Sequence, residues 1–126
     1  MKYIIMLATV LGLEVSDFVT GMIKGYIHKD LSSSKMRRGG LNKIGEIIIM
    51  ATSCGLEAGI RELGRYYESD RLGEITGAFT AIAVFVYIVI MELISILENY
   101  AQINSDAVWV AKLLRRLKKV NKEEEK

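Results

Sequence analysis

The sequence predicts an all-α membrane protein: a single membrane domain over residues 1–126, with three transmembrane helices followed by a C-terminal basic amphipathic helix. Two observations lead to this fold class. The chain is 51% hydrophobic and also 25% charged, and the charges gather between long apolar runs. Each run can cross a hydrocarbon core of about 30 Å at about 1.5 Å per residue.

The first predicted span covers about residues 3–25. Between Tyr3 and Ile23 its only charged residues are Glu14 and Asp17. An apolar run at the N-terminus is also typical of a cleaved signal peptide, but the two acids and the lack of a small-x-small cleavage pattern argue against one. We therefore expect this segment to remain as a helix.

The second and third predicted spans cover residues of about 43–61 and 75–98. A soluble three-helix bundle is the alternative, and its helices should carry polar residues at every third or fourth position. The stretch "ITGAFTAIAVFVYIVIM", residues 75–91, has no charge and is apolar on every face. The second span is less apolar, since it contains Glu46 and Glu57. The third run therefore favours the membrane most strongly.

Charge asymmetry predicts how the spans are oriented. The loop 26–42 and the tail 104–126 are rich in Lys and Arg, whereas acids outnumber cations in the loop 62–74 and its flanks. The positive-inside rule then places the basic loop and the tail in the cytoplasm, and the N-terminus and the loop 62–74 outside. The predicted cytoplasmic anchors, next to lipid headgroups, are Lys35, Arg37, Arg38, Lys43, Arg115, Arg116, Lys118 and Lys119.

The basic loop contains "SSSKMRRGG", residues 32–40. Nucleic-acid binding and phosphorylation are rival explanations of this cluster, but no base-stacking aromatic residues alternate with its cations, so no nucleic-acid partner is expected. Ser33 or Ser34 can cap a helix that begins near Lys35. Gly39-Gly40 is expected to break that helix before Leu41.

The tail has the pattern of an amphipathic helix capped by Ser105 or Asp106. Its cations surround one apolar face, which is formed by Ala107, Val110, Leu113, Leu114, Leu117 and Val120. Such a helix lies in the membrane interface, with Trp109 at the headgroups. Packing against partner subunits is an equally open alternative.

Each span also carries a stripe of polar residues. The stripe of the first span is Glu14, Asp17, Thr20, Gly21 and Lys24; that of the second is Glu46, Ser53 and Glu57; and that of the third is Glu92, Ser95 and Asn99, with Glu98 close by. A carboxylate at bilayer depth costs about 2.5–3.5 kcal/mol, so these groups should face protein or water. Lys24 could pair with Asp17 inside a self-contained monomer. One lysine does not balance several acids, however, so we favour an oligomer with an aqueous lumen.

Small residues in the spans indicate close helix contacts, within one chain or between chains. They are Ala51, Gly55 and Gly59 in the second span, and Gly73 and Gly77 before and in the third. Catalytic and metal-binding patterns are missing: His28 is the only histidine and Cys54 the only cysteine. The sequence therefore predicts no enzyme, no metal and no cofactor.

Two segments carry a family resemblance. "SDFVTGMIKGYIHKDLSSSKMRRGGLNKIG" resembles the bacteriophage holins of the toxin-secretion/phage-lysis family, which have an Asp-x-x-Thr-Gly element, a Lys, a Ser-Ser pair and a basic Gly-containing stretch. The matching residues are Asp17, Thr20, Gly21, Lys24, Ser33, Ser34, Arg38, Gly39, Lys43 and Ile44. "MELISILENYA" is similar to the end of the family's last span, through Glu92, Leu93, Ser95, Glu98 and Asn99. This chain departs from the family pattern in having no proline, and in carrying Glu57 where an Asp is usual.

The resemblance implies a holin in the cytoplasmic membrane of the bacterial host. Such a protein forms homo-oligomeric lesions that dissipate the membrane potential and release an endolysin, which is a functional partner without being bound directly. Our hypothesis is that the acids act as the switch, neutral or paired at rest and ionised once water enters. Two alternatives are a small oligomeric channel and a regulatory, anti-holin-like subunit, neither of which would lyse cells alone.

Overall fold

The computed structural model describes residues 1–68, 71, 72, 74 and 80–125, and over these residues it contains helices and no strands. The four long helices are α1 (Lys2–Ile27), α2 (Ser33–Tyr67), α4 (Ala81–Ile103) and α5 (Val108–Glu124). The predicted all-α class is confirmed. Of the predicted third span, the first residues up to 79 lie largely outside the described residues.

Two of the helices, α1 and α4, are long and apolar enough to cross a membrane. Only 17% of the apolar window of α1 and 33% of that of α4 is buried inside the chain. The core helix of a soluble protein would be mostly buried, so these helices present their apolar sides outward. Among the described residues, α2 does not meet the same test of length and composition, because Glu46 and Glu57 interrupt its apolar run. A crossing by α2 therefore stays a prediction.

Helix α2 is continuous over 35 residues, so the predicted break at Gly39-Gly40 is wrong. Each glycine costs a helix only about 1 kcal/mol relative to alanine, and neither has a positive φ. The connection to α1 is correspondingly short, residues 28–32. The helix is capped one residue earlier than expected, since the Ser32 hydroxyl accepts a hydrogen bond from the Lys35 backbone N–H at 3.3 Å.

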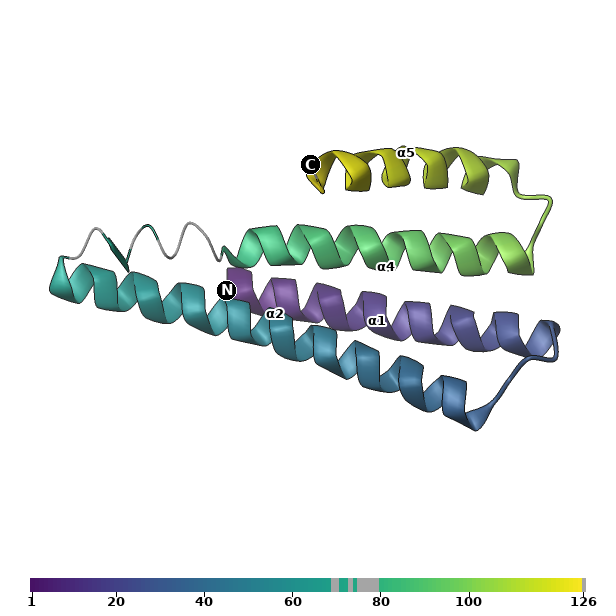
Figure 1. Ribbon diagram of the computed structural model, residues 1–126, viewed down its shortest axis with the longest axis horizontal. Helices are drawn as coiled ribbons and strands as arrows, with labels where there is room; N and C mark the ends of the chain where they lie inside the picture. Colours follow the sequence, from purple (N-terminus) through teal and green to yellow (C-terminus); the bar gives the residue numbers. More distant parts are fainter. Residues whose placement is uncertain (69–70, 73, 75–79, 126) are drawn as a thin grey trace.

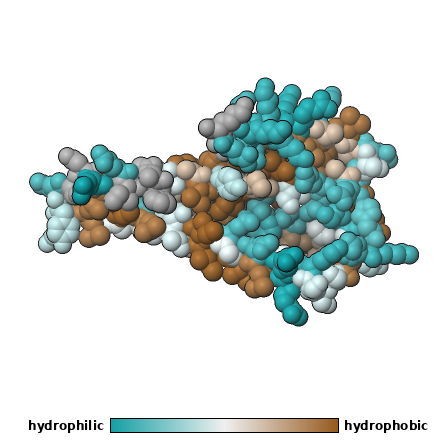
Figure 2. Space-filling model, viewed as in Figure 1, coloured by the Kyte–Doolittle hydropathy of each residue, from teal (hydrophilic) through white to brown (hydrophobic). Residues whose placement is uncertain are grey.

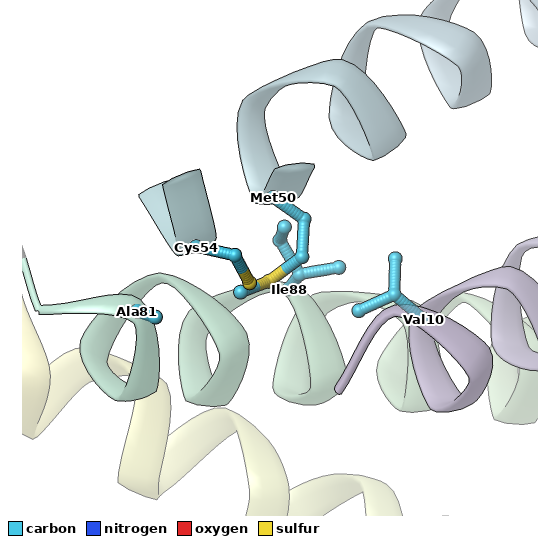
Figure 3. Close-up of a cluster of buried hydrophobic side chains, with 5 residues drawn as sticks. All are labelled: Val10, Met50, Cys54, Ala81 and Ile88. Atoms are coloured by element: carbon cyan, nitrogen blue, oxygen red, sulfur yellow. The ribbon is translucent and has the colours of Figure 1, made fainter. Parts of the chain in front are cut away.

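Three of these helices, α1, α2 and α4, form a bundle in which they lie side by side. Helices α1 and α4 run in the same direction, and α2 runs opposite to both (Figure 1). Their apolar core consists of Val10 from α1, Met50 and Cys54 from α2, and Ala81 and Ile88 from α4 (Figure 3). The last turns of α2 extend beyond the start of α1. The C-terminal ends of α1 and α4 meet the N-terminal end of α2 at one end of the bundle.

Helix α5 folds back along α4 (Figure 1). Val110 is fully buried there, and the Trp109 ring lies 6.0 Å from the Tyr100 ring, measured between centroids. The predicted cap by Ser105 or Asp106 is wrong: Ala107 is the N-cap and makes no side-chain bond. The Asp106 backbone N–H instead donates to the Asn104 side chain at 3.3 Å, which closes a local turn before the helix begins.

Large apolar side chains are exposed on the outside of the bundle, whereas several carboxylates are buried inside it next to the apolar core. Ile4 and Ile48 are 65% and 59% exposed, whereas Glu14 and Glu92 are 2% and 3% exposed. Hydrophobic surface covers the middle of the face in Figure 2, and hydrophilic residues gather over α5 and at the end of the bundle near the α1–α2 connection. Large exposed apolar areas are rare on soluble monomers. The distribution therefore supports contact with lipid.

Candidate functional site

The centre of the bundle holds a lysine surrounded by carboxylates from all three long helices. The ammonium of Lys43 on α2 lies 2.6 Å from Asp17 on α1, 2.5 Å from Glu92 on α4 and 3.3 Å from Glu14 on α1. The Lys43 side chain is only 16% exposed. The cluster therefore ties the three helices together through charges that face away from the surface.

Lys43 was predicted to be a cytoplasmic anchor, and in this single-chain structure it is an interior ion-pair partner instead. The Lys24–Asp17 pair, which was the possibility considered for a self-contained monomer, is not the one observed: Asp17 pairs with Lys43. Helix periodicity carried the signal: Lys43 and Glu46 are three residues apart, and Met50 and Ser53 continue the same face. A lysine on the polar stripe of a span belongs to that stripe.

Asn99 on α4 connects this cluster to the end of α1. Its amide donates to the Asp17 carboxylate at 3.0 Å, to the Asp17 carbonyl at 3.3 Å and to the Thr20 hydroxyl at 3.1 Å. Gly21 lies beside this contact, and a Cβ added there would meet the Asn99 amide nitrogen at 3.6 Å, an ordinary van der Waals distance. The predicted stripes of α1 and α4 thus meet within one chain.

Glu57 forms a second centre near the start of α1 and α4. One carboxylate oxygen accepts hydrogen bonds from Lys2 at 2.9 Å, Arg61 at 2.7 Å and the Tyr3 hydroxyl at 3.3 Å. The other accepts the backbone N–H of Ala81 at 2.6 Å, the first residue of α4. A carboxylate at a helix N-terminus satisfies an unpaired N–H and the positive end of the helix dipole. Sequence reasoning identified Glu57 and missed all four partners.

Other predicted residues lie apart from these two centres. Glu98 pairs with Lys118 of α5 at 2.7 Å, on the surface. The Ser53 hydroxyl donates to the Ile49 carbonyl within α2 at 2.9 Å, and Ser95 lines a cavity beside Asn99. The other predicted anchors are exposed: Arg37, Arg38, Arg115, Arg116 and Lys119.

The α2 part of the predicted small-residue stripe does not pack against another helix among the described residues. Ala51, Gly55 and Gly59 are exposed, and no atom would lie within 4 Å of a Cβ added at Gly55 or Gly59. Gly73 and Gly77 lie outside the described residues. Within the described part of the chain, the stripe on α2 thus remains open to a second molecule or to lipid.

In the first turn of α2, the Lys35 ammonium lies 2.7 Å from the carboxylate of Asp30, which is in the α1–α2 connection. The hydrogen bond and the positive charge of Lys35 lower the pKa of the Asp30 carboxyl below its usual value. Both side chains are exposed, so the pair orders the connection without burying charge. It lies at the entrance of a cavity of about 350 Å³, which is also lined by Asp17, Lys43 and Asn99.

Comparison with known families finds one match that covers nearly the whole chain. Residues 2–121 match the family described as the bacteriophage holin family. Searches of curated proteins and of solved structures find no match.

Proposed function

Because the chain belongs to the bacteriophage holin family, we propose that it oligomerises in the host cytoplasmic membrane and forms lesions that dissipate the membrane potential and release an endolysin. The observation that carries this proposal is the inverted distribution of polarity. Buried carboxylates lie inside a bundle whose outer surface is apolar. A subunit of this kind can be stored in lipid with its polar stripes paired, and can later turn them toward water.

The proposed topology has three crossings, by α1, α2 and the segment that contains α4. The N-terminus lies outside, and the α1–α2 connection and α5 lie in the cytoplasm. The alternating directions of the three helices are compatible with this threading, and the cations near the α1–α2 connection agree with the positive-inside rule. In this topology, the cytoplasmic end contains Glu98 of α4 together with Lys118 and the other polar residues of α5.

The proposed trigger is the opening of the Lys43 cluster. In the single chain, Asp17 and Glu92 share the ammonium of Lys43, which offsets part of the cost of burying them. A water-filled lumen between subunits would hydrate the same carboxylates, so the pairs with Lys43 would no longer favour the closed bundle over the assembled oligomer. The time of lysis should therefore depend on how strongly these pairs stabilise the closed bundle.

Inducible expression in bacteria, with and without a co-expressed endolysin, tests the function. We expect abrupt lysis only when both proteins are present, and a loss of membrane potential in either culture. Continued growth with an intact potential would contradict the proposal and would favour the regulatory, anti-holin-like alternative. Selective ion conductance without cell death would favour a channel.

The same assay tests the trigger. Asp17→Asn and Glu92→Gln remove one charge each from the Lys43 cluster, so we expect the time of lysis to shift in both variants. Glu98→Gln is the matched control, because Glu98 is on the same helix as Glu92 but pairs with Lys118 at the surface. Unchanged timing in both cluster variants would rule out the proposed trigger.

A further inference from the structure

Three glutamates from three helices converge at the centre of the bundle. Glu14 of α1, Glu46 of α2 and Glu92 of α4 each place a carboxylate oxygen within 4.8 Å of the other two. Glu14 and Glu92 are buried, while Glu46 lies at the partly exposed edge. Like charges this close repel each other when water is largely excluded, so the group favours the binding of a proton or of a cation among its oxygens.

Lys43 supplies such a positive charge only in part for Glu14. Its ammonium lies 2.6 Å from Asp17 and 2.5 Å from Glu92, and it pairs with Glu14 at the longer distance of 3.3 Å. Both carboxylate oxygens of Glu14 are fully buried, and neither accepts a hydrogen bond from any described residue. Glu14 is thus a 98% buried carboxylate whose charge is shared with one distant ammonium and which has no hydrogen-bond donor among the described residues.

The charges around the cluster do not balance. Glu14 and Asp17 on α1, Glu46 on α2 and Glu92 on α4 are four carboxylates, and Lys43 is the cation that pairs with them among the described residues. Uncompensated charge in such an interior is strongly unfavourable. A second cation bound among the three glutamates would remove most of the excess.

A cavity leads from the end of the bundle that carries the α1–α2 connection to the neighbours of the site. It has a volume of about 350 Å³ and is lined by exposed Asp30 and Lys35 and, further in, by Asp17, Lys43 and Asn99. Water can therefore reach Lys43, which pairs with Glu14 and Glu92, although the three glutamates themselves do not line the cavity.

We propose that Glu14, Glu46 and Glu92 bind a divalent cation of the oxygen-preferring class, such as Mg²⁺, Ca²⁺ or Mn²⁺. Carboxylate oxygens are the ligands that these ions select, and water from the cavity can complete the coordination. Asp17 stays paired with Lys43 and Asn99 and is not a ligand. Both oxygens of Glu92 accept hydrogen bonds from Lys43 in this structure, so Glu92 would turn one of them from Lys43 to the ion. The bound ion holds α1, α2 and α4 together at the point where their charges would otherwise repel. The inference does not depend on lysis activity.

The test uses the full-length chain in detergent micelles, with Mn²⁺ as the probe. Binding is followed by the loss of the electron paramagnetic resonance signal of free Mn²⁺. We expect saturable binding of one ion per chain, competed by Mg²⁺ or Ca²⁺. Glu14→Gln and Glu46→Gln should each weaken binding at least about tenfold, the loss typical even for partners that only orient a metal ligand. Glu98→Gln should bind as the unmodified chain does.

Lys43→Met separates a metal site from a merely structural cluster. Removing the ammonium 3.3 Å from Glu14 takes away a competing charge, so Mn²⁺ should bind more tightly and should restore helix content if the variant is partly unfolded. Glu46 lies at the edge of the cluster, so Glu46→Gln should keep the circular dichroism of the folded chain. No saturable binding to the unmodified chain, or equal binding by the Glu14, Glu46 and Glu98 variants, would overturn the proposal.

Discussion

At the scale of single residues, Glu57 joins the start of the chain to the start of α4. Its carboxylate is 6% exposed and holds Lys2, Tyr3 and Arg61 through one oxygen and the Ala81 backbone N–H through the other. Thr80, the N-cap of α4, makes no capping bond with its side chain. Glu57 therefore caps α4 from a different helix, which makes the start of α4 depend on α2.

Replacing Glu57 by alanine should destabilise the bundle. The Ala81 N–H would lose its acceptor while buried, a cost of about 1–3 kcal/mol, whereas Lys2 and Arg61, each 49% exposed, can turn to water. We expect the free energy of unfolding to fall by about 2 kcal/mol in total, because the dipole interaction is lost as well. Unfolding by SDS in mixed micelles, followed by circular dichroism, measures this.

Glu62→Ala is the matched control for that experiment. Glu62 is on the same helix, its side chain is 75% exposed, and it lies 3.6 Å from Arg65. Exposed pairs of this kind contribute about 0–1 kcal/mol, so the control should change stability little. Glu57→Gln keeps an oxygen for the Ala81 N–H and should fall between the two. Equal stability of the Glu57 and Glu62 alanine variants would show that the cap is unimportant.

The residues of the candidate site could be found from the sequence, but their partners could not all be found. The cost of a carboxylate in a span was enough to identify Glu14, Asp17, Glu57 and Glu92. Lys43 was assigned to the cytoplasmic end because the positive-inside rule counts lysines near helix ends. The rule takes no account of whether a lysine side chain faces the lipid headgroups or the interior of the bundle. The bond from Glu57 to Ala81 depends on where α4 begins. The local sequence offers Thr80 as a cap there, and nothing local shows that its side chain makes no capping bond and that a glutamate of another helix takes this role.

At the scale of elements, α5 lies where its charges conflict with a spanning α4. The helix runs back along α4 (Figure 1), with Lys112 and Arg115 exposed on its outer side. If lipid surrounded this arrangement, the cations would lie at bilayer depth at about 2.5–3.5 kcal/mol each near the centre. The apolar stripe of α5 can pack against α4 or against the membrane interface. If α5 leaves α4 and binds the interface, its cations no longer lie at bilayer depth, and the Lys118–Glu98 pair is broken.

This leads to a prediction about the end of α5. We expect a tryptophan at position 120, in a Trp109→Phe/Val120→Trp chain, to lie at headgroup depth in vesicles. If α5 stayed along α4, that residue would be deeper than residue 109 by up to about 16 Å, since 11 residues separate them at about 1.5 Å each. Quenching by lipids brominated near the headgroup or deep in the chain measures the depth. Stronger quenching by the deep probe would mean that α5 remains docked on α4.

At the scale of the whole molecule, the polarity of each helix was predictable and the continuity of the second helix was not. Apolar runs predicted α1 and α4 because both helices remain apolar enough to cross a membrane in spite of the acids that they contain. Helix α2 carries two glycines at its basic end and two glutamates in its apolar part, and it continues through all four because helix formation is cooperative along the chain. The support for a crossing by α2 therefore comes from its neighbours. Helices α1 and α4 run in the same direction (Figure 1). If both cross the membrane, the chain between them has to cross back.

That return can be measured with cysteines at the two ends of α2. In a Cys54→Ala chain, Ser34→Cys and Glu62→Cys each place one exposed thiol, separated by about 42 Å along a helix of 1.5 Å per residue. This exceeds a hydrocarbon core of about 30 Å, so the two thiols should lie on opposite sides. A membrane-impermeant maleimide added to right-side-out vesicles before lysis begins should label residue 62 directly and residue 34 only after permeabilisation. Labelling of both residues would mean that α2 does not cross. The reverse pattern would mean that it crosses with the opposite orientation, with its basic end outside.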